Sequence, residues 1–214
     1  MADIFTEVDE DLRRDRAERL WKKYGKYVLA LAVVIVAATA GWVWWTDQQR
    51  RQAAAEGERF FAALSQTEGS SSSTAANAVG AVARDAKSGF RVIALLHEAG
   101  FKARAGEAEA ALAIYRAVAA DMTADPDLRD AATLLGAMVA VENLPRAEID
   151  AMLAGISNDR SAWRFSAFDV GATAALRAGD RARARELYTR IADDAAAPPS
   201  LRARAAELLQ ALGE

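Results

Sequence analysis

The sequence contains no cysteine, a single histidine (His97) and four prolines in 214 residues. The lack of cysteine excludes a disulfide scaffold, a thiolate zinc site, an iron–sulfur cluster and a cysteine nucleophile. It does not fix the compartment, because an oxidising space permits disulfides without requiring them. With one histidine, a histidine-based metal cluster or a Ser-His-Asp triad lacks its parts. We expect His97 to be a packed or half-exposed helix residue.

An excess of one charge is also missing, since 27 basic residues face 30 acidic ones and the formal net charge is -3. We therefore expect no nucleic-acid partner. The motifs GxxxxGK[ST], GxGxxG, HExxH and GxSxG do not occur, so nucleotide, dinucleotide, zinc-hydrolase and serine-hydrolase functions lack their minimum parts. We predict no catalytic, cofactor-binding or metal-binding residue. A hydrolase with an unrecognised site is the least favoured interpretation.

Charge is absent altogether from residues 27–46, YVLALAVVIVAATAGWVWWT. At 1.5 Å per residue, these 20 residues extend over about 30 Å, the thickness of one hydrocarbon core. Trp42, Trp44 and Trp45 stand near the end of the run, where indole rings favour the membrane interface. A buried core helix seldom lacks charge over such a length. The segment therefore predicts a transmembrane helix in a lipid bilayer.

Basic residues are distributed unevenly around this segment. Seven lie before it, within residues 13–26, and three lie after it, within residues 50–59. The positive-inside rule then predicts a charged cytoplasmic tail over residues 1–26 and an outer domain over residues 47–214. For a bacterial inner membrane the outer face is the periplasm. The chain is therefore expected to be a single-pass inner-membrane protein with its N-terminus in the cytoplasm and its outer domain in the periplasm.

A cleavable signal peptide is the alternative, because Ala38-Thr39-Ala40 matches the small-x-small cleavage pattern. The apolar run continues to Trp45 and the first 26 residues include seven acidic ones, both of which argue against cleavage. In the tail, Ile4, Val8 and Leu12 recur every four residues. This narrow stripe suits a helix that docks on a partner, lies on the membrane or is simply solvated.

Beyond the span, residues 47–66 are expected to continue as a helix. The segment Thr67 to Thr74 has no apolar residue and predicts a loop. Further on, residues 88–141 align without gaps on residues 161–214 at a constant offset of 73. The weight of the alignment rests on scarce residues: Gly106 with Gly179, Tyr115 with Tyr188, and Pro126 with Pro199.

Each copy predicts a helix, a tight turn and two more helices. Gly106 and Gly179 suit a left-handed C-cap. In the second helix, Ala111, Tyr115 and Val118, or Ala184, Tyr188 and Ile191, fall on one face. The third helix is expected over Leu128 to Val141 and Leu201 to Leu212, after a proline that stops its predecessor. Leu128 to Val141 and Arg146 to Leu153 form an irregular middle pair. No strand pattern competes, so the predicted fold class is all-α.

A helix, a glycine-acidic turn, a helix with alanine and an aromatic residue four apart, and then a proline resemble the tetratricopeptide repeat. The matching residues are Gly106, Ala111, Tyr115 and Pro126, then Gly179, Ala184, Tyr188 and Pro199. Stacked helix pairs of this kind form an inner wall from their first helices, which can hold a partner segment. By register we place these candidate protein-binding residues near the wall: Leu96, Gly100, Arg104, Asp169, Thr173 and Arg177. The alternative is that they only pack or face water.

The whole layout combines the tail DIFTEVDEDLRRDRAERLWKKYGK, one span and an Ala-rich tetratricopeptide-like domain. It resembles the YfgM-like proteins, ancillary subunits of the SecYEG translocon. The resemblance implies a non-enzymatic periplasmic domain that associates with the translocon and with the membrane-anchored chaperone PpiD. A scaffold for another envelope assembly, such as cytochrome maturation or cell division, is the alternative.

Overall fold

The computed structural model describes residues 3–87 and 89–213, with side chains for residues 22–27, 29–87 and 89–213. All its regular elements are helices, in agreement with the predicted all-α class. Their bounds are α1 Asp3–Gln66, α2 Ser72–Asp85, α3 Phe90–Arg104, α4 Ala108–Ala120, α5 Pro126–Ala140, α6 Arg146–Leu153, α7 Arg164–Arg177, α8 Arg181–Ala192 and α9 Pro199–Gly213. The apolar stripe of the tail (Ile4, Val8, Leu12) lies outside the residues whose side chains are described.

The chain divides into two compact units, residues 1–52 and residues 53–214, and helix α1 runs through both. In the first unit, the apolar run exposes large side chains, with Val36 68% and Trp42 73% exposed. Its hydroxyl groups are satisfied within the helix, since Thr39 donates to the Ile35 carbonyl at 2.7 Å. Hydroxyls need such partners in lipid. By length and composition this part of α1 could cross a membrane.

The predicted loop Thr67 to Thr74 is too long by three residues. A turn ends at Ser71, whose hydroxyl accepts a hydrogen bond from the Thr74 amide and caps helix α2. Gly69 adopts a φ of 79° within the turn. The serines therefore start a helix, because a serine side chain satisfies an amide that the first turn leaves unpaired. Helix α2 itself was not predicted.

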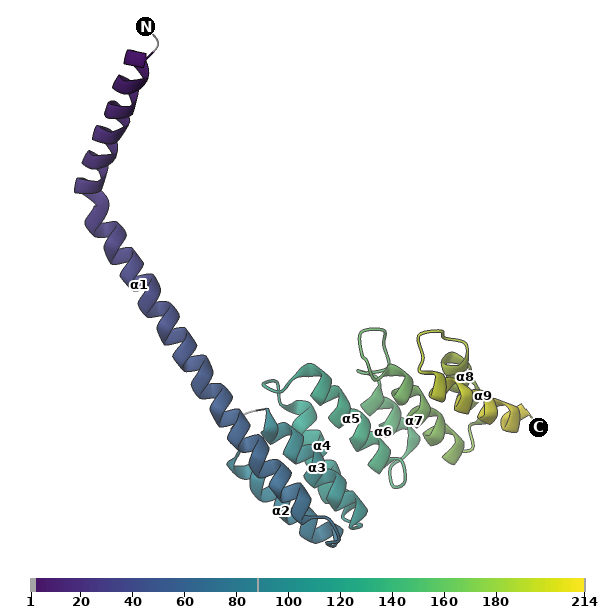
Figure 1. Cartoon of the computed structure of the whole chain (residues 1–214). Helices are drawn as coiled ribbons and strands as arrows, with labels where there is room; N and C mark the ends of the chain where they lie inside the picture. The colour runs from purple at the N-terminus through teal and green to yellow at the C-terminus, as the bar shows by residue number, and fades with distance from the viewer. Residues whose placement is uncertain (1–2, 88, 214) are drawn as a thin grey trace. The chain divides into compact units, whose positions relative to one another are not determined.

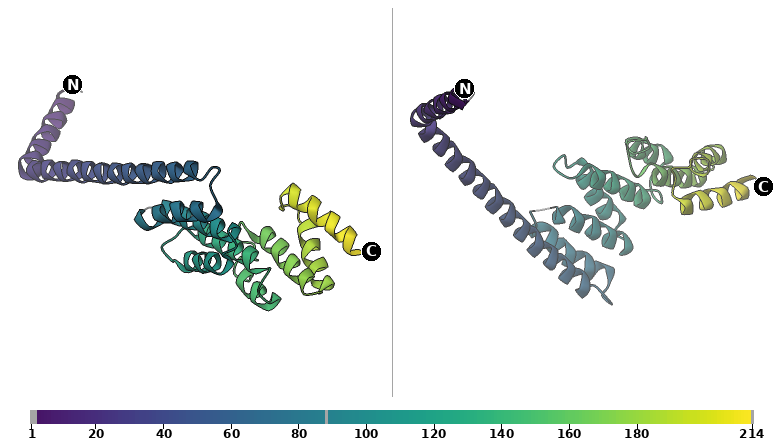
Figure 2. Two further views of the ribbon diagram at one scale, coloured as in Figure 1. Left: turned by 90° about the horizontal axis from the view of Figure 1, so that it is seen from below. Right: turned by 45° about the horizontal axis from the view of Figure 1, so that its top comes forward.

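The helices of the second unit pack in chain order from α2 to α9 (Figures 1 and 2), each against the next. Helix α3 also contacts α5, and α5 contacts α7. The helices therefore form the pairs α3–α4, α5–α6 and α7–α8. The first helices of these pairs, α3, α5 and α7, form one row, and the second helices, α4, α6 and α8, lie beside it. Residues 53–66 of α1 extend the first row, because the Phe60 ring lies against the rings of Phe90 and His97 on α3.

Two glycines end first helices in the way the sequence predicts. Gly106 has a φ of 84° and Gly179 a φ of 77°, in the left-handed region that favours glycine. After each glycine an acidic residue donates its amide back to the helix, Glu107 to the Lys102 carbonyl and Asp180 to the Ala175 carbonyl, both at 2.9 Å. This is the Schellman arrangement, which satisfies carbonyls at the helix end. The left-handed caps are confirmed.

Helices α5 and α9 begin at Pro126 and Pro199, two residues earlier than the predicted Leu128 and Leu201. Proline has no amide hydrogen to lose in the first helical turn, so it can be part of the helix that it was expected only to precede. The Asp125 carboxylate caps α5 by accepting from the Asp127 amide at 2.9 Å. Helix α6 has the predicted bounds.

The cores around Tyr115 and Tyr188 use equivalent positions. Both tyrosines are buried, at 3% and 2% exposure. The cluster around Tyr115 has seven buried residues, Tyr115 among them. Adding 73 to each residue number gives a buried residue of the Tyr188 cluster. The seven are Val92, Ala99, Ala111, Tyr115, Val118, Ala124 and Ala132, with the counterparts Phe165, Ala172, Ala184, Tyr188, Ile191, Ala197 and Ala205. Two helix triplets thus share one packing scheme.

Candidate protein-binding surface

The burial pattern gives the register of the three first helices. Ala99, Ala137 and Ala172 are fully buried on α3, α5 and α7. Twelve residues after each alanine, Ala111, Ile149 and Ala184 are fully buried on the following helix. Alanine at five of these six positions lets the paired helices approach closely, and Ile149 fills the sixth. The three pairs therefore have equivalent positions, at spacings of 38 and 35 residues.

With this register the six predicted wall residues become nine. Leu96, Gly100 and Arg104 on α3 align with Asp169, Thr173 and Arg177 on α7, as expected. Sequence reasoning missed the middle triplet on α5 and its extension, which consists of Leu134, Met138 and Glu142. The spacings of 38 and 35 residues between Ala99, Ala137 and Ala172 are the sequence signal that places α5 in register with α3 and α7. The middle pair has no glycine-acidic turn, which hid the register.

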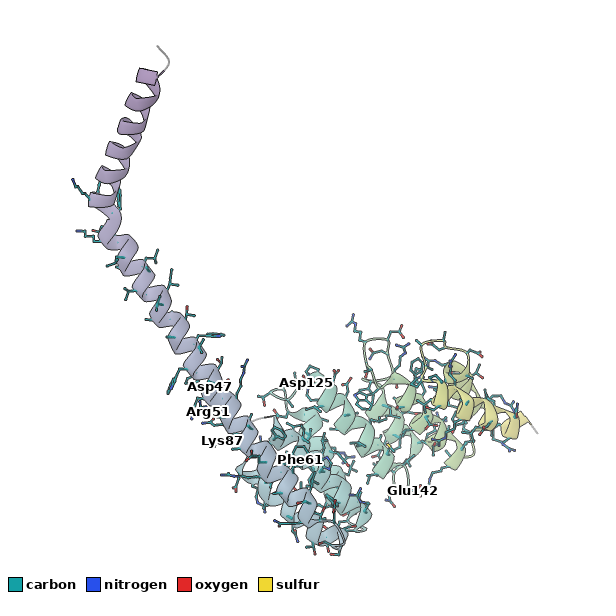
Figure 3. The ribbon with its side chains drawn as sticks, viewed as in Figure 1. Asp47, Arg51, Phe61, Lys87, Asp125 and Glu142 are labelled. Atoms are coloured by element: carbon teal, nitrogen blue, oxygen red, sulfur yellow. The ribbon has the colours of Figure 1, made fainter. Side chains whose placement is uncertain are left out.

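Arg177 is held by its neighbour. Its guanidinium pairs with the Glu142 carboxylate and donates to the Glu142 carbonyl at 2.8 Å. Figure 3 labels Glu142 at the end of α5. The pair joins α7 to the end of α5 along the edge of the wall. Arg177 therefore has a structural partner, and its charge is largely matched.

Arg104, at the equivalent position on α3, has different contacts. Its guanidinium carbon lies 4.5 Å from the centre of the Phe101 ring, and it forms no ion pair within the described residues. Gly100 faces the Tyr115 hydroxyl, which would lie 3.6 Å from a side-chain carbon added there. Leu96 is half-buried against the Tyr115 cluster. This end of the wall keeps an unpaired cation beside an apolar surface.

At the other end, Asp169 and Thr173 are engaged in packing. The Asp169 carboxylate pairs with Arg204 on α9 at 3.2 Å. Burial raises the pKa of Asp169, and the nearby Arg204 acts in the opposite direction. The Thr173 hydroxyl donates to the Asp169 carbonyl at 3.0 Å. Asp169 therefore ties α7 to α9, and the Thr173 hydroxyl is satisfied within α7.

The centre of the wall is apolar and accessible. Met138 is 52% exposed, and it lies between the positions of Gly100 and Thr173. Leu134, one turn earlier, is buried in the neighbouring core cluster. A flexible thioether suits contact with varied apolar side chains. Leu96, Met138 and Arg104 are thus the wall residues most available to a partner.

His97 has the packing role that the sequence predicts. Its ring meets the Phe60 ring edge-on, with the ring centres 5.2 Å apart. Burial of part of the ring, and then the charge of Arg104, lower the pKa of His97. Its counterpart at the offset of 73 is Val170, a buried apolar residue. Nothing about the position requires an imidazole.

Carboxylates that lie close in sequence are used in caps and ion pairs. Glu107 pairs with Lys102 at 2.8 Å, and Asp194 pairs with Arg164 at 3.4 Å. Within the part of the chain that the structure describes, no group of three or more His, Asp or Glu residues is placed to hold a metal ion.

Stacked helix pairs with left-handed glycine turns and buried small residues at the pair contact match a known family. The model of the tetratricopeptide repeat-like domain matches residues 18–211. The chain belongs to this family. Its fold is typically a scaffold for protein interaction. Comparisons with curated proteins and with solved structures returned no match.

Proposed function

We propose that the protein is a membrane-anchored, non-enzymatic subunit that binds other proteins through its helical domain. Residues 1–26 form a cytoplasmic tail, residues 27–46 the anchor and residues 47–214 a periplasmic domain. The observation that carries the proposal is the pairing of an exposed, uncharged helix with a family scaffold built for protein contacts. An exposed apolar helix of this length needs lipid around it.

We assign partner binding to the wall formed by α3, α5 and α7. Met138 and Leu96 supply apolar contacts, and Arg104 supplies a cation without an ion pair among the described residues. This combination suits a segment with apolar side chains and a carboxylate, since such a segment would bury apolar area and pair the guanidinium. Asp169, Thr173 and Arg177 shape the far end of the wall through their own internal contacts.

The domain is proposed to have arisen by duplication of residues 88–141 as residues 161–214. The shared set of buried positions supports this origin. The pair between them, α5 with α6, completes the row of first helices.

For partners we propose the SecYEG translocon and periplasmic chaperones such as PpiD, on the resemblance of the layout to YfgM-like proteins. The second candidate is a scaffold for cytochrome maturation or cell division. A helical wall serves either assembly, so the identity of the bound protein decides between them.

Topology is the first test. Alkaline phosphatase fused after Gly69, in the turn before α2, is expected to be active and to stay in the membrane fraction, whereas a fusion after Lys22 is expected to be inactive. Active enzyme released into the soluble periplasm would show a cleaved signal peptide and contradict the anchor.

Crosslinking in intact membranes tests the partners. A photoreactive residue at Met138 is expected to capture translocon or chaperone subunits, and the same residue at Ala182 on the charged helix α8 serves as the matched control. Trp21 provides a site in the tail. Recovery of division or haem-assembly proteins alone would favour the second candidate, and equal labelling from Met138 and Ala182 would contradict binding at the wall.

A further inference from the structure

A cavity of about 300 Å³ opens between α4, α5 and α6, on the side of the second helices. Ala132, Thr133 and Gly136 line it from α5. At 100° per residue these three fall on the side of α5 opposite to Leu134, Met138 and Glu142. The cavity is therefore separate from the wall. For scale, a buried cavity of about 150 Å³ lined by aliphatic side chains can hold a benzene molecule.

The next repeat has a larger side chain at the equivalent place. A matching hollow between α6, α7 and α8 is lined by Ala167, Phe168 and Gly171, the equivalents of Ala132, Thr133 and Gly136 at a spacing of 35. There the Phe168 ring is buried at 5% exposure, and the Arg190 guanidinium carbon lies 4.0 Å from the ring centre. About 270 Å³ remains open beside the ring, and Arg146, Arg183 and Arg190 line it, so the counterpart hollow is charged where the α4–α6 cavity is mostly apolar. Leu95 holds the position on α3. Thr133 alone is small, so the middle pair lacks a large apolar side chain that its neighbours have.

The surface around the cavity also differs in charge from the equivalent surface of the next repeat. The outward face of α4 carries four exposed alanines, and the same positions of α8 carry two basic and two acidic residues. These pairs are Ala110 with Arg183, Ala113 with Glu186, Ala117 with Arg190 and Ala120 with Asp193. The cavity rim has one charge, Arg116, whose side chain has no hydrogen bond or ion pair within the described residues.

The chain itself offers a side chain of the required kind. Phe61 lies on the part of α1 in the second unit, where Figure 3 labels it. Its side chain is 64% exposed. In the described part of this unit, the exposed large apolar side chains are Phe61, Met122 and Met138. Phe61 is the aromatic one of the three. Glu58 precedes it by one helical turn, is exposed, and forms no ion pair within the described residues. Residues three apart share a helix face.

We propose that the protein self-associates by docking Phe61 of one copy into the α4–α6 cavity of a second copy, with Glu58 paired to Arg116. The ring contacts Met152 and the surrounding alanines, as Phe168 contacts its own core. An exposed aromatic ring and an apolar cavity each lose water when they meet, and Glu58 and Arg116, which form no ion pair within the described residues, have opposite charges. Phe61 and the cavity are different surfaces, so each junction joins Phe61 of one copy to the cavity of the other, and the two sides of one junction can be changed independently.

The lack of native cysteine makes disulfide crosslinking a clean test. Two differently tagged full-length chains, one with Ala62→Cys and one with Ala120→Cys, are co-expressed and oxidised in native membranes. We expect a mixed disulfide-linked dimer. Phe61→Ala on the first chain, or Thr133→Phe on the second, is expected to reduce its yield at least tenfold. Asp193→Cys, at the residue directly after α8 that corresponds to Ala120, is the control and should give no dimer.

Direction of the contact supplies the decisive control. The same two substitutions moved to the opposite chains leave this junction intact, so the crosslink should persist. Thr133→Val keeps the cavity and should also crosslink, which separates cavity filling from misfolding. No dimer, or a dimer that is insensitive to Phe61→Ala and Thr133→Phe, overturns the proposal. A photoreactive residue at Ala120 that labels only lipid or another protein overturns it as well.

This outcome is distinguishable from failure of the proposed function. Phe61→Ala and Thr133→Phe leave Leu96, Met138 and Arg104 in place, so crosslinking of partners from Met138 should be unchanged by either substitution.

Discussion

Helices α4 and α8 occupy the same place in their triplets, yet they differ on their two sides. Toward the core, Tyr115 and Tyr188 are buried among residues that correspond one to one. Toward solvent, α4 presents alanines where α8 presents arginine, glutamate and aspartate. The inner face is fixed by packing, which tolerates little change in volume. The outer face is less constrained by packing, so its residue types can differ between the two copies.

The wall shows the same contrast along its length. Arg177 is paired with Glu142, while Arg104 lies on Phe101 without an ion pair among the described residues. One copy uses its arginine to hold neighbouring helices together, and the other leaves it available. Equivalent positions in the two copies thus have different contacts within the domain.

The largest expected effect tests the equivalence of the cores. Tyr115→Ala and Tyr188→Ala should each lower the free energy of unfolding by about 3–5 kcal/mol, because each removes a buried ring and leaves a cavity. Urea unfolding of the full chain in detergent micelles, followed by circular dichroism, measures both. A loss of stability in only one of the two variants would contradict the equivalence of the two cores.

The turns come next in size. Gly106→Ala and Gly179→Ala should each cost about 1–2 kcal/mol, because a side chain in the left-handed region is strained. Gly89→Ala is the matched control, since Gly89 has a φ of -54° and open space around it. The same unfolding assay applies, and a cost at Gly89 equal to that at Gly106 would contradict the role of the caps.

The Arg177–Glu142 pair predicts a smaller difference between the copies. Both side chains are largely exposed, so a double-mutant cycle with Arg177→Ala and Glu142→Ala should give a coupling of about 0.2–1 kcal/mol. Arg104→Ala should show no coupling to Glu142→Ala and should instead weaken partner crosslinking from Met138. Equal coupling for both arginines would remove the distinction between them.

The smallest effect concerns pH. The pKa of His97 is lowered in the folded chain, so the unfolded chain binds more protons as pH falls below about 6.5. Stability should therefore fall with pH in that window. His97→Val places the residue of the second copy there and should flatten this part of the profile. Urea midpoints of both chains at pH 7.5 and 5.5 give the comparison, and parallel profiles would contradict it.

Much of the architecture follows from local signals. The glycine caps, the ends of α6 and the face shared by Ala111 and Tyr115 were predictable, because backbone conformation and helical periodicity act within a few residues. Helix α2 was missed because a serine-rich stretch resembles a loop until Ser71 is seen to cap it. The wall residues on α5 were missed because the middle pair has Pro145 in place of the glycine turn that marks the others.

By itself the sequence determined the all-α class, the uncharged helix and the equivalence of Tyr115 with Tyr188, because each depends on residue type and spacing along the chain. Only the tertiary structure decided which charges are matched and where a mostly apolar cavity opens. Glu142 and Arg177 are 35 residues apart, and the space beside Thr133 is lined by residues of three helices. Such properties arise from surfaces that meet only when the helices pack, so no local pattern records them.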